Sequence, residues 1–217
     1  MRQSIIIILS LLFLSGAYAQ QPATLAAVQH ISKLEIKKKK RHNIPGRDSS
    51  IVLHIDTLIM HDRAHLEFYG RKDVTLQVKH AIIPKRAYIS GTDGKNNASD
   101  MDISMRFDEL GKLYVLAGGR DANNGSRTFP NGDGGEVDFK YLADGIRPQT
   151  EDKDGDHYLH IDTEAGGKAV NARSDLYNIY SRIGSGGRPL GQLPQGQVYS
   201  GVAGDDGKSE IKEVSDF

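Results

Sequence analysis

The sequence predicts an all-β fold, and three features of its 217 residues support this prediction. Short runs in which apolar and polar residues alternate recur from residue 51 onward, as in strands with one buried face. Each run is followed by Gly, Asn or Asp, which tolerate the positive φ angles of tight turns. Helical periodicity is scarce, and its best example is one short stretch formed by Leu176, Ile179, Tyr180 and Ile183.

The chain begins with the pattern of a secretory signal peptide. Arg2 precedes an apolar run over residues 5–14, and the small residues Ala17 and Ala19 stand just before Gln20. The run is shorter than the roughly 20 apolar residues that a membrane-spanning helix needs. We therefore expect residues 1–19 to be removed on export, which would place the mature chain in the periplasm or at the cell surface.

Residues 20–50 form a polar, basic segment with one unusual feature. Five consecutive cations repel one another and favour an extended, solvated chain; they are Lys37, Lys38, Lys39, Lys40 and Arg41. Two interpretations stay open: a disordered leader, or a binding site for an anionic partner such as lipid headgroups or an acidic protein. The whole chain has 28 basic and 28 acidic side chains, a balance that argues against a nucleic-acid-binding protein.

Residues 51–207 form the expected β-rich domain, and residues 208–217 an acidic tail. Strand-like runs lie at residues 51–55, 66–68, 74–78, 101–107, 113–116, 137–139 and 158–161. Some runs are evenly spaced: 23 residues separate Leu53 from Leu76, and 22 separate Val115 from Val137 and Val137 from Leu159. Periods of this length are typical of solenoids, in which each turn buries its apolar face against the next.

Glycine is concentrated behind these strands. Only Gly16, Gly46 and Gly70 of the 24 glycines precede residue 91, so 24 − 3 = 21 follow. With its short strands and its Gly-, Asn- and Asp-rich loops at 91–100, 118–135 and 184–207, the chain resembles exported right-handed parallel β-helix proteins of Gram-negative bacteria. The resemblance is architectural, covers about residues 51–207, and implies stacked turns around a narrow core. An antiparallel β-sandwich with long loops is the alternative.

The acidic stretch at residues 151–156 is the strongest local candidate for a metal site. Carboxylates at alternate positions around a glycine can converge on Ca²⁺, which takes six to eight oxygen ligands. The candidate ligands are Asp152, Asp154, Asp156, Asp162 and Glu164. The glycine spacing departs from that of an EF-hand loop, and a solvated turn is the other interpretation.

The sequence carries no recognisable catalytic motif. It has no Cys, so thiol nucleophiles, thiolate metal sites and disulfides are excluded. No Gly-x-Ser-x-Gly elbow, no His-Glu-x-x-His pair and no Walker phosphate loop occurs. His61 and His65 would share a face only on a helix, and they lie between two strand-like runs. The glycine-rich loops are best interpreted as β-helix corners or surface loops.

These observations favour a non-enzymatic, exported protein of the cell envelope. Its β-scaffold would present loops that bind an envelope protein or a polysaccharide. Two alternatives belong to other classes: a Ca²⁺-dependent polysaccharide-cleaving enzyme, and a structural subunit of an envelope complex held by residues 37–41.

Overall fold

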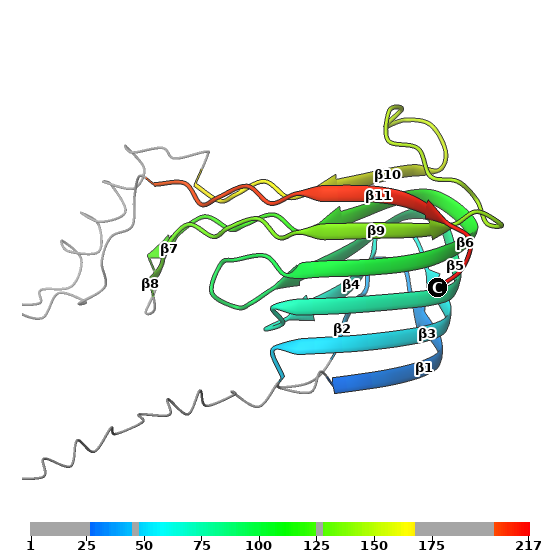
Figure 1. Cartoon of the computed structure of the whole chain (residues 1–217), viewed down its shortest axis with the longest axis horizontal. Coiled ribbons are helices and arrows are strands. Elements are labelled where there is room, and N and C mark those ends of the chain that lie inside the picture. The colour runs from blue at the N-terminus through cyan, green and yellow to red at the C-terminus, as the bar shows by residue number, and fades with distance from the viewer. Residues whose placement is uncertain (1–26, 45–47, 125–127, 168–201) are drawn as a thin grey trace, which may run out of the picture.

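The computed structural model describes residues 27–44, 48–124, 128–167 and 202–217, and every regular element in these ranges is a β-strand. Nine of the strands stack in parallel into a β-solenoid, shown in Figure 1, and β7 and β8 form a separate antiparallel pair. Their bounds are β1 (Ala27–Ile36), β2 (Arg41–Asn43), β3 (Ser50–Met60), β4 (Ala64–Tyr69), β5 (Asp73–Thr92), β6 (Asp100–Leu116), β7 (Asn123–Asn124), β8 (Thr128–Phe129), β9 (Val137–Leu142), β10 (Tyr158–Asp162) and β11 (Ser209–Val214).

The solenoid has two strand-bearing faces. The first face follows the order β1-β3-β5-β6-β9-β11, and the second consists of β2, β4, the later halves of β5 and β6, and β10. Register shifts between Val78 and Ala81 and between Ile83 and Arg86 mark the bend at which β5 passes from one face to the other. Each turn of the chain therefore contributes one segment to each face.

Apolar side chains from both faces fill the interior in columns that follow the strand register. Leu53, Leu76, Ile103 and Phe139 are paired in register on the first face, and all four are fully buried. Burying a side chain of this size stabilises the fold by about 1.5–3 kcal/mol. The column shows how a chain that is only 38% hydrophobic builds a core: apolar residues repeat at the inward positions of each turn, and several such columns run side by side.

The all-β class and the parallel solenoid that the sequence predicts are confirmed, and the β-sandwich is wrong because successive long strands are parallel neighbours. The 23-residue interval from Leu53 to Leu76 is a true register pair. The 22-residue intervals that follow Val115 do not join register partners. Val115 pairs with Ile161 on the second face, whereas Val137 pairs with Met101 on the first. The later turns are longer than the sequence spacing suggested.

The solenoid extends into both segments that we expected to flank it. Residues 27–36 of the basic segment form β1, which pairs with β3, and residues 209–214 of the acidic tail form β11, which pairs with β9. The predicted signal peptide and the helix-like stretch at residues 176–183 lie outside the described residues. Over the described ranges the chain holds no helix long and apolar enough to cross a membrane.

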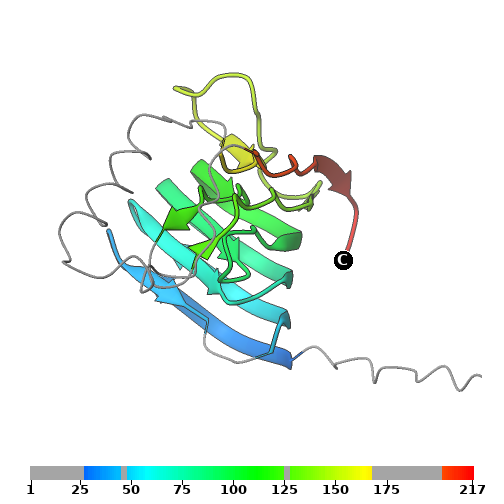
Figure 2. The same ribbon diagram turned by 90° about the vertical axis from the view of Figure 1, so that its left-hand side faces the viewer.

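A bundle of extended, glycine-rich segments occupies the side of the molecule where the strands of the first face begin and those of the second face end. We call residues 96–99, 117–121, 131–136, 163–167 and 203–207 the glycine bundle. Figure 2 views the molecule from this side. Backbone hydrogen bonds join segment 131–136 to all four others, through the pairs Ala98–Asp133, Gly132–Arg120, Gly166–Gly132 and Gly134–Asp205.

The bonded positions in the glycine bundle follow a three-residue period. Gly132 and Gly135 donate to the carbonyl oxygens of Arg120 and Ala117, and Gly204 and Gly207 donate to those of Gly166 and Thr163. Three residues per turn is the period of a polyproline II helix, which makes no internal hydrogen bonds and so offers its donors to neighbours on several sides. Where the structure describes them, the glycine-rich segments are therefore a packed structural element and not corners of the β-strands.

Candidate functional site

Each of four successive turns of the solenoid places one cation at the corner where the chain enters the second face. Lys39 stands in the turn after β1, Arg63 in the turn before β4, Arg86 where β5 enters the second face, and Lys112 at the equivalent place in β6. The register from Ala64 to Ala87, together with the backbone hydrogen bond from Lys39 to Asp62, stacks these four positions. We call them the basic column.

Local backbone geometry explains how the first two cations reach the column. Lys39 and Arg63 have φ angles of 57° and 58°, in the left-handed region that a tight turn requires. The amide of Lys39 donates to the carbonyl oxygen of Asp62, and the amide of Arg63 donates to that of Arg86. The two turns therefore share a left-handed residue at equivalent positions, and the backbone hydrogen bonds stack them on successive turns.

Groups within the protein neutralise the basic column only in part. Arg63 Nε lies 3.5 Å from a carboxylate oxygen of Asp62, whose charge also acts on Arg86. Lys112 Nζ lies 3.9 Å from a carboxylate oxygen of Asp154 and donates to the carbonyl oxygens of Lys153 and Asp154. Within the described ranges, neither Lys39 nor Arg86 has a carboxylate within ion-pair distance. Neighbouring strands are about 4.8 Å apart, so the four cations span roughly 14 Å. Like charges directly opposite one another destabilise a sheet.

A second column of outward side chains lies two residues further along the same strands. It consists of Arg41, His65, Tyr88, Tyr114 and His160, which are paired in register, and we call it the aromatic column. The rings of His65 and Tyr88 stack with centroids 4.4 Å apart, and those of Tyr88 and Tyr114 with centroids 5.3 Å apart. The ring faces are therefore turned toward one another and the ring edges toward the surface.

The two columns are electrostatically connected. A hydrogen bond with Tyr88 raises the pKa of Arg86, with a smaller Coulombic contribution from the same phenol. Desolvation lowers the pKa of His65, and the nearby charge of Arg41 lowers it further. His65 is therefore neutral at pH 7, and the positive charge of this surface comes from the lysines and arginines.

The sequence predicted the first part of this surface and missed the rest. Lys37, Lys38, Lys39, Lys40 and Arg41 form the exposed turn from β1 to β2 and the start of β2, so they belong to the folded solenoid and are not a leader. Arg41 makes an ion pair of 3.0 Å with Glu67. The missed cations follow Lys39 at intervals of 24, 23 and 26 residues, a spacing that becomes visible only once the turn length is known.

The five predicted calcium ligands are not brought together. Asp152, Asp154 and Asp156 lie in the exposed turn that precedes β10, whereas Asp162 and Glu164 lie at the opposite end of that strand. Oδ1 of Asp152 accepts the amide of Asp154, and Oδ1 of Asp162 accepts the amide of Glu164, so both carboxylates order their own turns. Across the described residues, no three carboxylate or imidazole groups are placed to share a metal ion.

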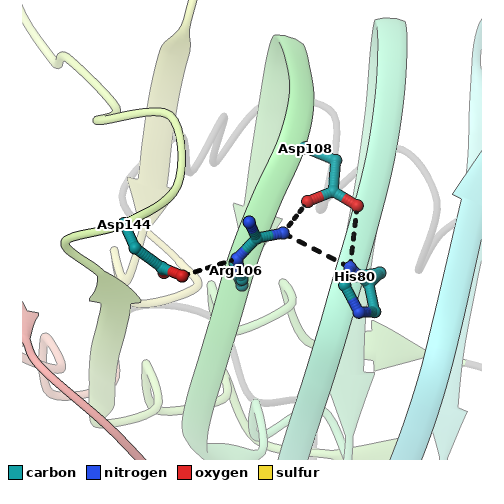
Figure 3. Close-up of polar contacts among 4 residues, drawn as sticks. All are labelled: His80, Arg106, Asp108 and Asp144. Atoms are coloured by element: carbon teal, nitrogen blue, oxygen red, sulfur yellow. Dashed lines mark hydrogen bonds and ion pairs between the residues drawn. The ribbon is translucent and has the colours of Figure 1, made fainter.

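A polar cluster at the bend of β5 and β6, drawn in Figure 3, is another concentration of titratable groups. Arg106 contacts Asp108 and lies 3.1 Å from Asp144, while Nδ1 of His80 lies 2.9 Å from Asp108. The hydrogen bond with Asp144 is the main cause that raises the pKa of Arg106. Each member of the cluster pairs with another member, so the cluster braces the bend of β5 and β6 and leaves no cation for a ligand.

Comparisons with known proteins give no relative from which function could be transferred. No family model matches the chain, and neither a curated protein nor a solved structure matches it. The surface chemistry of the solenoid is therefore the basis for a functional proposal.

Proposed function

We propose that this chain is an exported, non-enzymatic protein of the cell envelope that binds an acidic polysaccharide through the basic column. One observation supports the proposal above all: the fold stacks Lys39, Arg63, Arg86 and Lys112 in successive turns. Such a stack costs stability, and binding of a polyanion would offset that cost. Export is inferred from the signal-peptide pattern of residues 1–19.

The chemistry of the surface favours a polysaccharide over a membrane. Interfacial binding combines cations with apolar side chains that enter the lipid. The exposed large apolar side chains of the described residues are Val28, Tyr69, Val202, Ile211 and Phe217, and none belongs to either column. A row of evenly spaced cations along a corner of the solenoid instead matches a polymer whose charges repeat at regular intervals.

The direct test is binding to immobilised polygalacturonate, with the neutral polymer dextran as the reference. We expect the protein to bind polygalacturonate and not dextran, and to be released by salt, which screens exposed charges beyond about 8 Å at physiological ionic strength. A variant with Lys39→Gln, Arg63→Gln, Arg86→Gln and Lys112→Gln should lose binding.

A matched control separates the column from net charge. Replacing Lys33, Lys72, Lys95 and Lys208 with Gln removes the same charge from exposed positions away from the turn that holds Lys39. This control should keep most of the binding. Equal loss in both variants, or retention of both polymers alike, would contradict the proposal. Release of reducing ends from polygalacturonate would contradict the non-enzymatic part of it.

A further inference from the structure

We infer that the ligand is a linear, carboxylated polysaccharide that lies along the solenoid axis, with one carboxylate on each of four successive turns. This inference rests on the proposed function and specifies the ligand class and its orientation. The basic column runs across the strands, because its members are register partners on neighbouring strands. A polymer that follows the column therefore crosses the strands and does not run along one of them.

The order of cations in the column favours carboxylates. Arg63 and Arg86 occupy the two central positions, and Lys39 and Lys112 the two ends. A guanidinium group can bind a carboxylate with two parallel hydrogen bonds, whereas an ammonium group acts as a point charge. Arg86 has no carboxylate within ion-pair distance in the described part of the chain; it hydrogen-bonds Tyr88, and its other N–H donors can bind a ligand. The arginines would orient the polymer and the lysines would hold its ends.

The aromatic column provides polar edges beside this line of charge. It lies two residues further along each strand, at roughly 7 Å. Because His65, Tyr88 and Tyr114 stack on one another, their ring faces are covered, and sugars cannot stack on them. The partly exposed phenols of Tyr88 and Tyr114 can instead exchange hydrogen bonds with sugar hydroxyls.

The site has a defined end. The residue that pairs in register with Lys112 on the next turn is Tyr158, which is only 7% exposed. The fifth turn therefore contributes no cation, and the charged line stops after roughly 14 Å. A ligand longer than this distance gains no further ion pair from the column.

The test measures binding of galacturonate oligomers of defined length, from one to eight units, by calorimetry on the full mature chain. We expect the affinity to rise with each unit up to about four and then to level off. Arg86→Gln should weaken binding of a tetramer about two- to fivefold, the effect of one exposed ion pair. Lys72→Gln, an exposed cation away from the column, should leave it unchanged.

Specific outcomes would overturn the inference. If polygalacturonate binds but tetramer affinity equals that of the monomer, or falls as much with Lys72→Gln as with Arg86→Gln, the axial site is wrong while the proposed function stands. If no acidic polymer binds, both are wrong. Tighter binding to phosphatidylglycerol vesicles than to polygalacturonate would assign the column to a membrane surface.

Discussion

Arg86 shows at the scale of a single residue why the basic column is unusual. Its guanidinium group stands between Arg63 and Lys112 in register, and it hydrogen-bonds Tyr88, whose ring lies in the next column. The hydrogen bond with Tyr88 and the charge of Asp62 raise the pKa of this group, so these contacts favour the cation. The stacked cations Arg63 and Lys112 oppose it.

We expect Arg86→Gln to weaken ligand binding and to leave stability nearly unchanged. The variant loses two like-charged contacts, with Arg63 and Lys112, but it also loses the attraction of Asp62. These opposing contributions should keep the change in Tm within about 2 °C, as measured by thermal melting at low ionic strength. A fall in Tm of more than about 4 °C would show that Arg86 mainly supports the fold.

His65 gives the second prediction at this scale. Its pKa is lowered from 6.5, first by desolvation and then by Arg41, so the unfolded chain takes up a proton at a higher pH than the folded one. Stability should fall as pH drops below about 6.5, until the folded imidazole is also protonated. In urea titrations at several pH values, His65→Gln should lose part of this acid dependence, and His42→Gln should keep it.

At the scale of elements, the glycine bundle depends on the absence of side chains. A Cβ atom added at Gly132 would lie 1.9 Å from the carbonyl oxygen of Asn96, and one added at Gly134 would lie 1.9 Å from that of Thr163. Backbone atoms on a neighbouring segment cannot move aside without breaking their own hydrogen bonds. Glycine is required at both positions because the segments touch directly.

We expect Gly132→Ala to destabilise the protein by about 1–3 kcal/mol or more through overpacking. Gly155→Ala is the matched control, since its added Cβ would meet only the side chain of Asp152, which can turn away. Equilibrium unfolding in urea compares the two variants. Equal stability of both would mean that the bundle is not closely packed.

The strand regions were predictable from the sequence because their signal is local, whereas the glycine bundle was not. Alternation over five residues identifies the strand that holds Leu53, and its register partner Leu76 follows at a simple interval. Gly132, by contrast, bonds Arg120 and Gly166 through backbone atoms, across 12 and 34 residues, and no side chain marks those partners. The basic column could be predicted only in part for the same reason. Lys39 lies in a run of charges, whereas Arg63 and Arg86 are recognised as its neighbours only once the register is known.

The whole molecule is a stack of turns whose last strand discourages further stacking. The buried column residues Val137, Phe139 and Tyr141 are followed in β11 by Ser209, Ile211 and Glu213. The hydroxyl of Tyr141 donates to Glu213 at 3.0 Å, so the carboxylate is held over the end of the core. Polar residues at the inward positions of an end strand protect a solenoid from edge-to-edge association.

Replacing Ser209 and Glu213 with Val should therefore promote self-association. The two changes continue the apolar columns to the end of the stack and leave the strand edge unprotected. Sedimentation velocity should show concentration-dependent oligomers for this variant, whereas the polar pair Ser209→Thr and Glu213→Gln should sediment as the parent protein does. A monomeric valine variant would mean that β11 does not act as a cap.

Mapping a bound galacturonate tetramer by NMR chemical-shift perturbation tests most directly whether stacking creates the ligand site. We predict that the amides of Lys39, Arg63, Arg86 and Lys112 shift together on titration, with smaller changes at Tyr88 and Tyr114. Shifts confined to the first face or to residues 128–131 would contradict this account, because the tetramer would then bind away from the basic column.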